Sequence, residues 1–242
     1  MIKEKAYAKI NIYLKVLDTR SDGYHDLESL MVPIDLCDEL EFMDSNEDII
    51  ISNIDIKDNI MYKAISYLKE QYNIKKNVKI ILNKKIPLSS GLAGGSADLS
   101  ATLRGLNKLW NLNLSIDELA QISLLFGSDT LFCMYNKPAI IKGRGELIEF
   151  VNYDKKNVLL FNPKIEVKTK DVFKEYKDSD TGENNLEMAL LRLYPQISDF
   201  KNYYDNQGLE LHLSGSGATY FSFNDIKYKP NENYLEIKCK TM

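Results

Sequence analysis

The sequence that decides the fold is IPLSSGLAGGSADLSATLRGLNKLW, residues 86–110. The apolar run at residues 78–82 precedes it and has the composition of a β-strand. Beyond the glycines, Leu99, Leu103 and Leu106 recur at the spacing of one helical face. The stretch therefore predicts a strand, a glycine turn and a helix, in that order.

The glycine turn itself predicts an anion site. Only 12 of the 242 residues are glycine, so the group Gly91, Gly94 and Gly95 marks a place where backbone geometry matters. Main-chain N–H groups at such a turn can converge on a phosphate, and a helix N-terminus adds partial positive charge. The turn is neither a Walker A loop nor a GxGxxG motif. A turn that only packs the helix on the sheet is the alternative.

The composition is that of an ordinary folded protein, with 44% hydrophobic and 27% charged residues. The formal net charge of -4 offers no basic field to a nucleic acid or an anionic membrane. Charged residues at positions 3–5 interrupt any signal peptide, and no apolar run approaches the roughly 18 residues of a membrane span. We therefore expect neither a nucleic-acid partner nor a membrane partner.

The cysteines indicate a reducing compartment. Cys37, Cys133 and Cys239 are odd in number and far apart, and only two histidines are available to complete a metal site. We therefore expect free thiols and a cytoplasmic location.

Residues 6–16 alternate between apolar and polar side chains, which predicts a half-buried strand with Lys9 and Asn11 on its polar face. Taken alone, that face is expected to meet solvent. Residues 59–71 have helical spacing.

A second helix is predicted to begin at a capping box formed by Ser115 and Glu118. It is expected to end near Phe126, where Gly127 can supply a left-handed stop. Asp129 follows directly, and capping a further helix is an ordinary role for an aspartate in that position.

A new set of elements begins near residue 152. We predict a strand at residues 158–161, a helix at 186–193 and a hairpin at 209–223. The chain is therefore divided into a domain at residues 1–151 and a shorter one at residues 152–242.

Six segments together resemble the GHMP small-molecule kinases. The glycine stretch and the later SGSG identify the superfamily, and the DGYH segment with GLNKLWNL resembles its 4-diphosphocytidyl-2-C-methyl-D-erythritol kinase branch. The segments are AKINIYL (8–14), SDGYHDLESLMVPIDLCDELEF (21–42), IPLSSGLAGGSADLSATLRGLNKLWNL (86–112), FGSDTLFCM (126–134), KGRGE (142–146) and LSGSGATYF (213–221).

The resemblance implies a two-domain α+β GHMP kinase fold, with an N-terminal S5-like ATP-binding domain and a smaller C-terminal α/β sandwich domain. It also implies transfer of the ATP γ-phosphoryl, with Mg²⁺, to the 2-hydroxyl of 4-diphosphocytidyl-2-C-methyl-D-erythritol in the non-mevalonate (MEP) route to isoprenoid precursors. The expected partners are this small molecule and ATP, and the expected state is a monomer or homodimer.

Family positions that carry function fall on residues of the matching type in this chain. The catalytic pair falls on Lys9 and Asp129. Positions that contact the cytidyl substrate fall on Asn11, Tyr24, His25 and Thr169. The ATP-binding positions fall on Pro87, Leu88, Ser89, Ser90, Gly91, Leu92, Ala93, Gly94, Gly95, Ser96 and Ala97, together with Asn59 and Lys84.

Each assignment has a physical reason. Phosphoryl transfer depends on positioning and charge neutralisation, so Asp129 can hold the hydroxyl and accept its proton while Lys9 neutralises the transferring group. The Ser96 hydroxyl can serve as a Mg²⁺ ligand by analogy. Tyr24 offers a flat face to a pyrimidine, and His25 can hydrogen-bond its edge. Without the resemblance, these last two residues read as an exposed loop tip.

The chain departs from the family pattern in several places. Thr130 and Leu131 replace an aliphatic residue and a proline, and Asn185 replaces an aspartate. Ala93 replaces a glycine, which predicts ordinary φ and ψ angles at that position. The chain also ends soon after SGSG, in a lysine-rich tail that is expected to lack a closing helix.

Two other functions fit parts of the pattern. A GHMP kinase for another alcohol, such as mevalonate or homoserine, would have no base to stack on Tyr24. A binding protein without activity would not need the pair Lys9 and Asp129. An RNA-binding relative with the same N-terminal fold is disfavoured by the net charge of -4.

Overall fold

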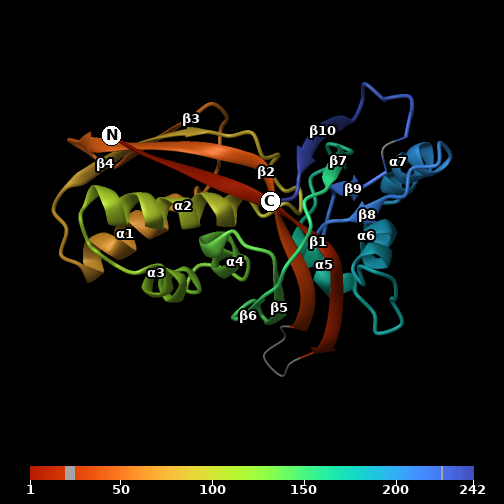
Figure 1. Cartoon of the computed structure of the whole chain (residues 1–242), viewed down its shortest axis with the longest axis horizontal. Helices are drawn as coiled ribbons and strands as arrows, with labels where there is room; N and C mark the ends of the chain where they lie inside the picture. Colours follow the sequence, from red (N-terminus) through yellow and green to blue (C-terminus); the bar gives the residue numbers. More distant parts are fainter. Residues whose placement is uncertain (20–24, 225) are drawn as a thin grey trace. The chain divides into compact units, whose positions relative to one another are not determined.

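The computed structural model describes residues 1–19, 25–224 and 226–242 (Figure 1). The chain forms two compact units that are interleaved along the sequence. Unit 1 comprises Met1–Ala8, Leu36–Pro87 and Ala93–Asn136, and unit 2 comprises Lys9–Asp35, Leu88–Leu92 and Lys137–Met242. The domain boundary predicted after residue 151 divides the chain into two continuous segments, whereas each unit here contains three segments, and the boundary stays a prediction.

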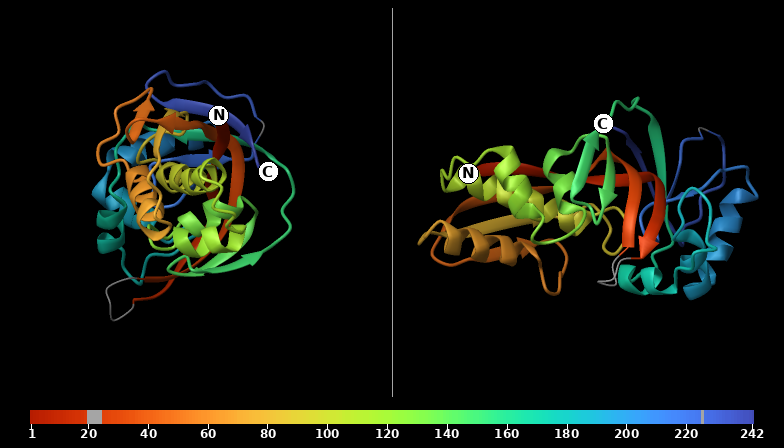
Figure 2. Two further views of the ribbon diagram at one scale, coloured as in Figure 1. Left: turned by 90° about the vertical axis from the view of Figure 1, so that its left-hand side faces the viewer. Right: turned by 90° about the horizontal axis from the view of Figure 1, so that it is seen from below.

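Unit 1 packs helices on one face of a short sheet (Figures 1 and 2). Its strands are β3 (Ile49–Ser52), β4 (Asn77–Asn83) and the second half of β2 (His25–Ser45). Strand β4 runs parallel to β3 and antiparallel to β2. The helices are α1 (Met61–Gln71), α2 (Gly94–Leu109), α3 (Ile116–Ser123) and α4 (Thr130–Tyr135).

The stretch at residues 86–110 folds as predicted. Alternate residues of β4 are buried, because a strand with one covered face turns every second side chain inward. Leu99, Leu103 and Leu106 of α2 are also buried. Gly105 lets this helix approach the sheet, since a Cβ there would lie 2.4 Å from the ring of Phe42.

The predicted start of helix α3 is confirmed, but its predicted end is not. The Ser115 hydroxyl accepts from the Glu118 N–H, and the Glu118 carboxylate accepts from the Ser115 N–H, which completes the capping box of α3. The left-handed stop at Gly127 is wrong: α3 ends at Ser123, and Gly127 has no positive φ. The chain instead leaves the helix through hydrogen-bonded turns at residues 124–126.

Unit 2 contains two groups of strands. The first half of β2 pairs with β5 (Ala139–Gly143), which pairs with β6 (Leu147–Phe150). Strand β1 (Ile2–Thr19) pairs with β2, and its residues from Lys9 onward belong to this unit. The second sheet has the order β10-β7-β9-β8. Its strands are β7 (Asn157–Asn162), β8 (His212–Leu213), β9 (Tyr220–Ser222) and β10 (Leu235–Lys240), and its helices are α5 (Thr169–Glu175), α6 (Glu187–Leu193) and α7 (Gln196–Asp205).

Aromatic side chains fill the core of unit 2. Phe161, Phe200, Tyr204 and Tyr220 are all buried, and their rings contact one another in tilted or edge-to-face geometry. The lysine-rich tail adds to this unit as strand β10, which pairs antiparallel with β7. The predicted strand at residues 158–161, the helix at 186–193 and the hairpin of β8 and β9 are confirmed.

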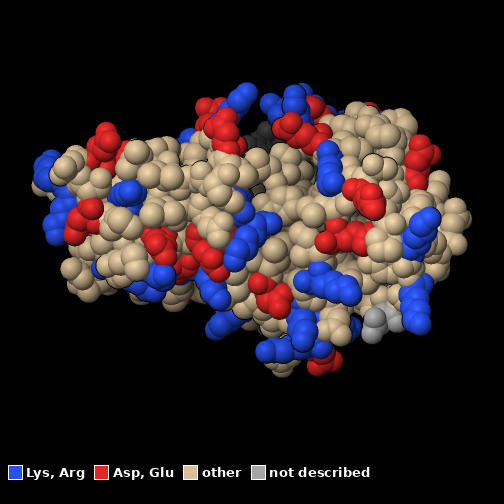
Figure 3. All heavy atoms as spheres, turned by 90° about the horizontal axis from the view of Figure 1, so that it is seen from above, with Lys and Arg blue, Asp and Glu red and all other residues tan. Residues whose placement is uncertain are grey.

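The surface carries both signs of charge. On the face shown in Figure 3, Lys and Arg side chains are interspersed with Asp and Glu. Among the helices that the structure describes, none is long and apolar enough to cross a membrane.

Candidate active site

Lys9 and Asn11 are buried in unit 2, with exposed fractions of 2% and 1%. The Lys9 ammonium donates to Asn11 Oδ1 at 2.6 Å and to the Gly91 carbonyl at 2.7 Å. Asn11 Nδ2 in turn donates to Ser29 Oγ at 2.7 Å. The expectation that this face of β1 meets solvent is therefore wrong at these two residues, because the glycine loop covers it. A buried, fixed ammonium is suited to stabilising negative charge.

The first half of the glycine loop, residues 88–92, belongs to unit 2 and rests on the SGSG turn. Gly91 has φ +76°, and a Cβ there would lie 2.2 Å from the Ser214 carbonyl. A Cβ on Gly215 would lie 2.9 Å from the Gly91 carbonyl and 3.1 Å from Lys9 Nζ. Both positions therefore need glycine, and their close approach holds the loop against Lys9.

Two asparagines fix the SGSG turn and β1. Asn184 Nδ2 donates to the Leu213 carbonyl at 3.0 Å and to the Gly215 carbonyl at 2.8 Å. Asn185 stands where the family pattern has aspartate, and its Oδ1 accepts from the Val16 N–H at 3.0 Å. A carboxylate oxygen would accept the same bond, so the departure keeps this contact.

The second half of the loop opens helix α2 in unit 1. Ala93 is the N-cap residue and has φ +60° and ψ +28°. The prediction of ordinary angles at Ala93 is therefore wrong: the position keeps the left-handed conformation that glycine would take, at some cost for an alanine. A Cβ on Gly95 meets none of the described atoms within 4 Å. The helix N-terminus thus has open space beside it, next to the half-buried Ser96.

Lys84 lies behind the start of α2, in a buried group of charges. Its ammonium donates to Asp38 Oδ2 at 2.5 Å and to Asp98 Oδ2 at 2.8 Å, and only 2% of the Lys84 side chain is exposed. Burial raises the pKa of Asp98 to about 7, and the charge of Lys84 opposes the shift. The predicted direct contact of Lys84 with nucleotide stays a prediction, but its ammonium already has two carboxylate partners.

Asp129 is half-buried at the N-cap of α4, and its side chain makes no capping hydrogen bond to that helix. Asp129 thus occupies the N-cap position, as the alternative expected, but without the side-chain hydrogen bond of a capping residue. Thr130 and its neighbours hold this turn: the Thr130 hydroxyl contacts the carbonyls of Ser123 at 2.6 Å and Gly127 at 2.5 Å. Ser100 of α2 donates to the Thr130 carbonyl at 2.9 Å. The threonine that departs from the family pattern thus holds the turn that carries Asp129, a contact that sequence reasoning missed.

The predicted substrate-binding residue His25 lies in an aromatic group of unit 2. His25 stacks on Phe173 with ring centroids 5.6 Å apart, and Tyr176 meets its edge at 5.8 Å. Thr169 Oγ1 lies 2.8 Å from Ser216 Oγ, on the SGSG turn. Tyr24 lies outside the described residues. Phe173 was missed because nothing in the sequence relates it to a residue almost 150 positions earlier.

Asn59 lines a cavity of about 550 Å³ in unit 1, formed by β3 and the segment before α1. Its Oδ1 accepts from the Met61 N–H at 3.0 Å, so it also fixes the helix start. The predicted contact of Asn59 with nucleotide stays a prediction.

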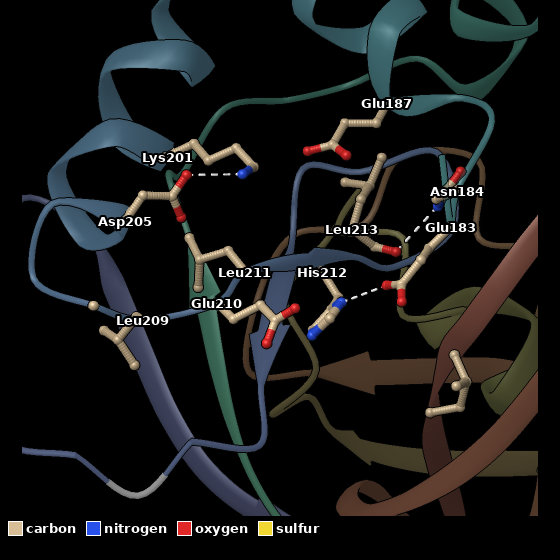
Figure 4. A pocket seen from close by; sticks show the side chains of 12 residues that line it. Glu183, Asn184, Glu187, Lys201, Asp205, Leu209, Glu210, Leu211, His212 and Leu213 are labelled. Carbon is tan, nitrogen blue, oxygen red and sulfur yellow. Dashed lines mark hydrogen bonds and ion pairs between the residues drawn. The ribbon is translucent and has the colours of Figure 1, made fainter. Parts of the chain in front are cut away.

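A cavity of about 480 Å³ in unit 2 contains none of the predicted site residues (Figure 4). In it, His212 Nδ1 lies 2.6 Å from Glu183 Oε2, and Lys201 donates to Asp205 at 2.8 Å. Burial raises the pKa of Glu187, whose carboxylate also lines the cavity. An acidic lining disfavours a ligand that carries phosphate.

The residues present fit a magnesium ion that is held mainly by phosphates. The described part of the chain contains no group of three His, Cys, Asp or Glu side chains that could hold a metal. Ser96 nevertheless presents a hydroxyl on the first turn of α2. Mg²⁺ in nucleotide sites usually takes one or two protein oxygens and completes its shell with phosphate and water.

Comparison with known sequences identifies the family. Residues 59–137 match the model of the GHMP kinases N terminal domain. The 4-diphosphocytidyl-2-C-methyl-D-erythritol kinase of Bacillus cereus (strain AH187) is 42% identical over an alignment 248 positions long, which covers 90% of this chain and 86% of that protein. The enzyme of the same name from Bacillus anthracis (strain CDC 684 / NRRL 3495) is equally similar, with the same coverage.

Comparison with solved structures identifies the fold. A crystal structure of 4-(cytidine 5'-diphospho)-2C-methyl-D-erythritol kinase matches with a TM-score of 0.83 at 24% identity, covering 100% of both chains. A mevalonate kinase matches with a TM-score of 0.71 at 14% identity, covering 100% of this chain and 99% of that one. The predicted α+β GHMP kinase fold is confirmed. The chain belongs to the 4-diphosphocytidyl-2-C-methyl-D-erythritol kinase family of the GHMP kinases.

Proposed function

We propose that this protein uses ATP to phosphorylate the 2-hydroxyl of 4-diphosphocytidyl-2-C-methyl-D-erythritol, as a step of the non-mevalonate (MEP) route to isoprenoid precursors. The observation that carries the proposal is the buried Lys9 ammonium, held by Asn11 and by a carbonyl of the glycine loop. Burying a cation costs free energy, and the buried cation can stabilise a transition state in which negative charge develops beside it. The identity of 42% to kinases of this name supports the choice of substrate.

Asp129 is the proposed base. Phosphoryl transfer proceeds with the acceptor oxygen already bonding to phosphorus, so the base has only to orient the hydroxyl and take its proton late. The turn held by Thr130 fixes the Asp129 backbone, which supports such an orienting role. Asn11, bonded to Ser29 and Lys9, is the proposed contact for the substrate alcohol.

The start of α2 is the proposed phosphate site. Its free N–H groups, the left-handed Ala93 and the open space at Gly95 together suit the approach of an anion. Mg²⁺, when bound with ATP, would neutralise charge on the phosphates, and Ser96 would supply one oxygen ligand.

A valine at Gly95 is expected to block this phosphate site without disturbing the fold. No described atom lies within 4 Å of a Cβ at that position, and its φ is not positive, so the side chain would project into open space. We expect the KM for ATP to rise by about 10-fold, equal to ~1.4 kcal/mol, with an unchanged melting temperature. Steady-state kinetics in which each substrate is varied will measure this. An equal rise in the KM of the cytidyl substrate would show that Gly95 is not specific to the nucleotide.

The aromatic group at His25 is the proposed site for the cytosine base. A flat aromatic face contributes roughly 1 to 3 kcal/mol to the binding of a base. We therefore expect Tyr24→Ala or Phe173→Ala to weaken the binding of CDP by about 5- to 150-fold, with ADP binding unchanged. His25→Ala is expected to cost the same or less, because water can replace part of a hydrogen bond in an accessible site.

Calorimetric titration of CDP measures these effects without catalysis. Phe223→Ala is a matched control, because Phe223 lies in unit 2 with its ring against Phe221 and His212, and it has no proposed role in binding. Equal binding of CDP by all variants, or no binding by any protein, would contradict the cytidyl assignment. Another alcohol of the GHMP kinases would then be the leading substrate.

Two further properties complete the proposal. The three cysteines are buried and form no disulfide bond, which fits a protein that works in the cytoplasm. A monomer or a homodimer is proposed, to be decided by sedimentation or light scattering.

A further inference from the structure

The buried charges around Lys84 connect two segments that border the proposed phosphate site. Asp38 lies on β2, and its Oδ1 accepts from the N–H groups of Lys85 at 2.5 Å and Ile86 at 2.8 Å. Its Oδ2 accepts from the Lys84 ammonium, which also donates to Asp98 of α2. The entry to the glycine loop and the helix that follows are thus joined through one ammonium.

This ammonium lies against the first turn of α2. A Cβ on Gly94 would lie 3.1 Å from Lys84 Nζ and 3.0 Å from Ile86 Cγ2. Gly94 is the first residue of α2, so the absence of a side chain there lets the lysine reach the helix N-terminus. The position of that N-terminus therefore depends directly on where the ammonium is held.

Stability alone does not account for such a group. Removing two carboxylates and an ammonium from water carries a large free-energy cost, and well-packed apolar residues often stabilise a core equally well. In addition, Asp98 Oδ1 has no hydrogen-bond partner among the described residues. A buried polar atom without a hydrogen-bond partner destabilises the fold, so we expect a functional role of this group beyond packing.

We infer that Asp38, Lys84 and Asp98 form a clamp that positions the N-terminus of α2 for the nucleotide phosphates, with Lys84 acting through Gly94 as a positioning residue. The inference rests on the proposed use of ATP and assigns roles to Asp38 and Asp98, which no motif identified. It also gives Lys84 a purpose that requires no direct contact with nucleotide. Displacing a phosphate cradle by about 1 Å can cost up to about 100-fold in rate.

The test compares ADP and CDP titrations of Asp98→Asn and Lys84→Met with the wild-type protein, alongside the KM for ATP, kcat and the melting temperature. Both variants are expected to weaken ADP binding by about 10-fold or more and to leave CDP binding within about twofold. Lys84→Arg keeps the charge and is expected to restore part of the ADP affinity. Lys85→Met is the matched control, because the Lys85 ammonium pairs with Glu39 at the surface, and it is expected to change neither affinity.

The outcomes separate the possible failures. If Asp98→Asn lowers the melting temperature but binds ADP normally, the clamp is only structural and the inference is overturned. Equal losses of ADP and CDP binding also overturn it. If Lys84→Met does not fold, the ADP and CDP affinities of Asp98→Asn test the inference. This variant is expected to fold, because asparagine keeps the shape of the side chain and one acceptor for Lys84. If the wild-type protein binds CDP but not ADP, the proposed use of ATP fails together with the clamp.

Discussion

Asp129→Asn is expected to lower kcat by about 10²- to 10⁴-fold, the contribution of a positioned base. The amide keeps the shape of the side chain but cannot accept the proton of the substrate hydroxyl. Its effect on folding should be small, because Asp129 is half-buried and does not cap α4. Single-turnover kinetics and a thermal melt of the same preparation will measure both quantities.

Asp117→Asn is the matched control for this prediction. Asp117 lies in the first turn of α3, in the same unit, and accepts from the Tyr135 hydroxyl at 2.7 Å. We expect this variant to keep wild-type kcat. Unchanged turnover in Asp129→Asn, or a loss explained by unfolding, would contradict the role of Asp129 as base.

Lys9→Met is expected to lower kcat/KM by about 10²- to 10³-fold, comparable to the loss of a donor that stabilises developing negative charge. Methionine fills a similar volume but leaves Asn11 Oδ1 and the Gly91 carbonyl without the bonds that the ammonium donates. A buried acceptor left unpaired costs about 1 to 3 kcal/mol, so the melting temperature should fall by several degrees as well.

The stability loss makes a control on the same strand necessary. The Lys15 ammonium donates to the Gly182 carbonyl in an exposed region, so Lys15→Met removes a cation of β1 outside the proposed site. We expect it to keep wild-type kcat/KM. Should Lys9→Met retain activity at temperatures where it is folded, the ammonium does not act in the chemistry.

The fold was largely predictable because its signals are local. The strand, turn and helix at residues 78–110 follow from spacing and from glycines, and the capping box of Ser115 and Glu118 lies within four consecutive residues. The end of α3 was not predictable in the same way. Gly127 permits a left-handed stop, but the Thr130 hydroxyl and hydrogen-bonded turns shape that segment instead.

The shared strand face of the candidate residues Lys9 and Asn11 could be predicted from the sequence, but their surroundings could not. Alternation along β1 shows that Lys9 and Asn11 share a face, yet it does not reveal what covers that face. The cover comes from the glycine loop and the SGSG turn, which lie about 80 and 200 residues further along the chain. A hydrogen bond between residues so far apart in sequence leaves no periodic signal.

The same reason explains the contacts that sequence reasoning missed. Lys84 and Asp38 are 46 positions apart, and Phe173 reaches His25 only once α5 has packed. Ala93 is a different case: its residue type argued for ordinary backbone angles, and the surrounding loop imposes a left-handed one instead. The constraint of the surrounding structure here overrides the local preference of alanine.

The most direct test of the proposed function is turnover with a panel of alcohols. Purified protein with ATP and Mg²⁺ would be given 4-diphosphocytidyl-2-C-methyl-D-erythritol, mevalonate or homoserine, and ADP release and the ³¹P NMR spectrum would be recorded. We predict ADP release only with the cytidyl substrate, accompanied by one new phosphomonoester resonance from the 2-phosphate. Phosphorylation of mevalonate or homoserine in its place, or no ADP release with any alcohol, would contradict the proposal.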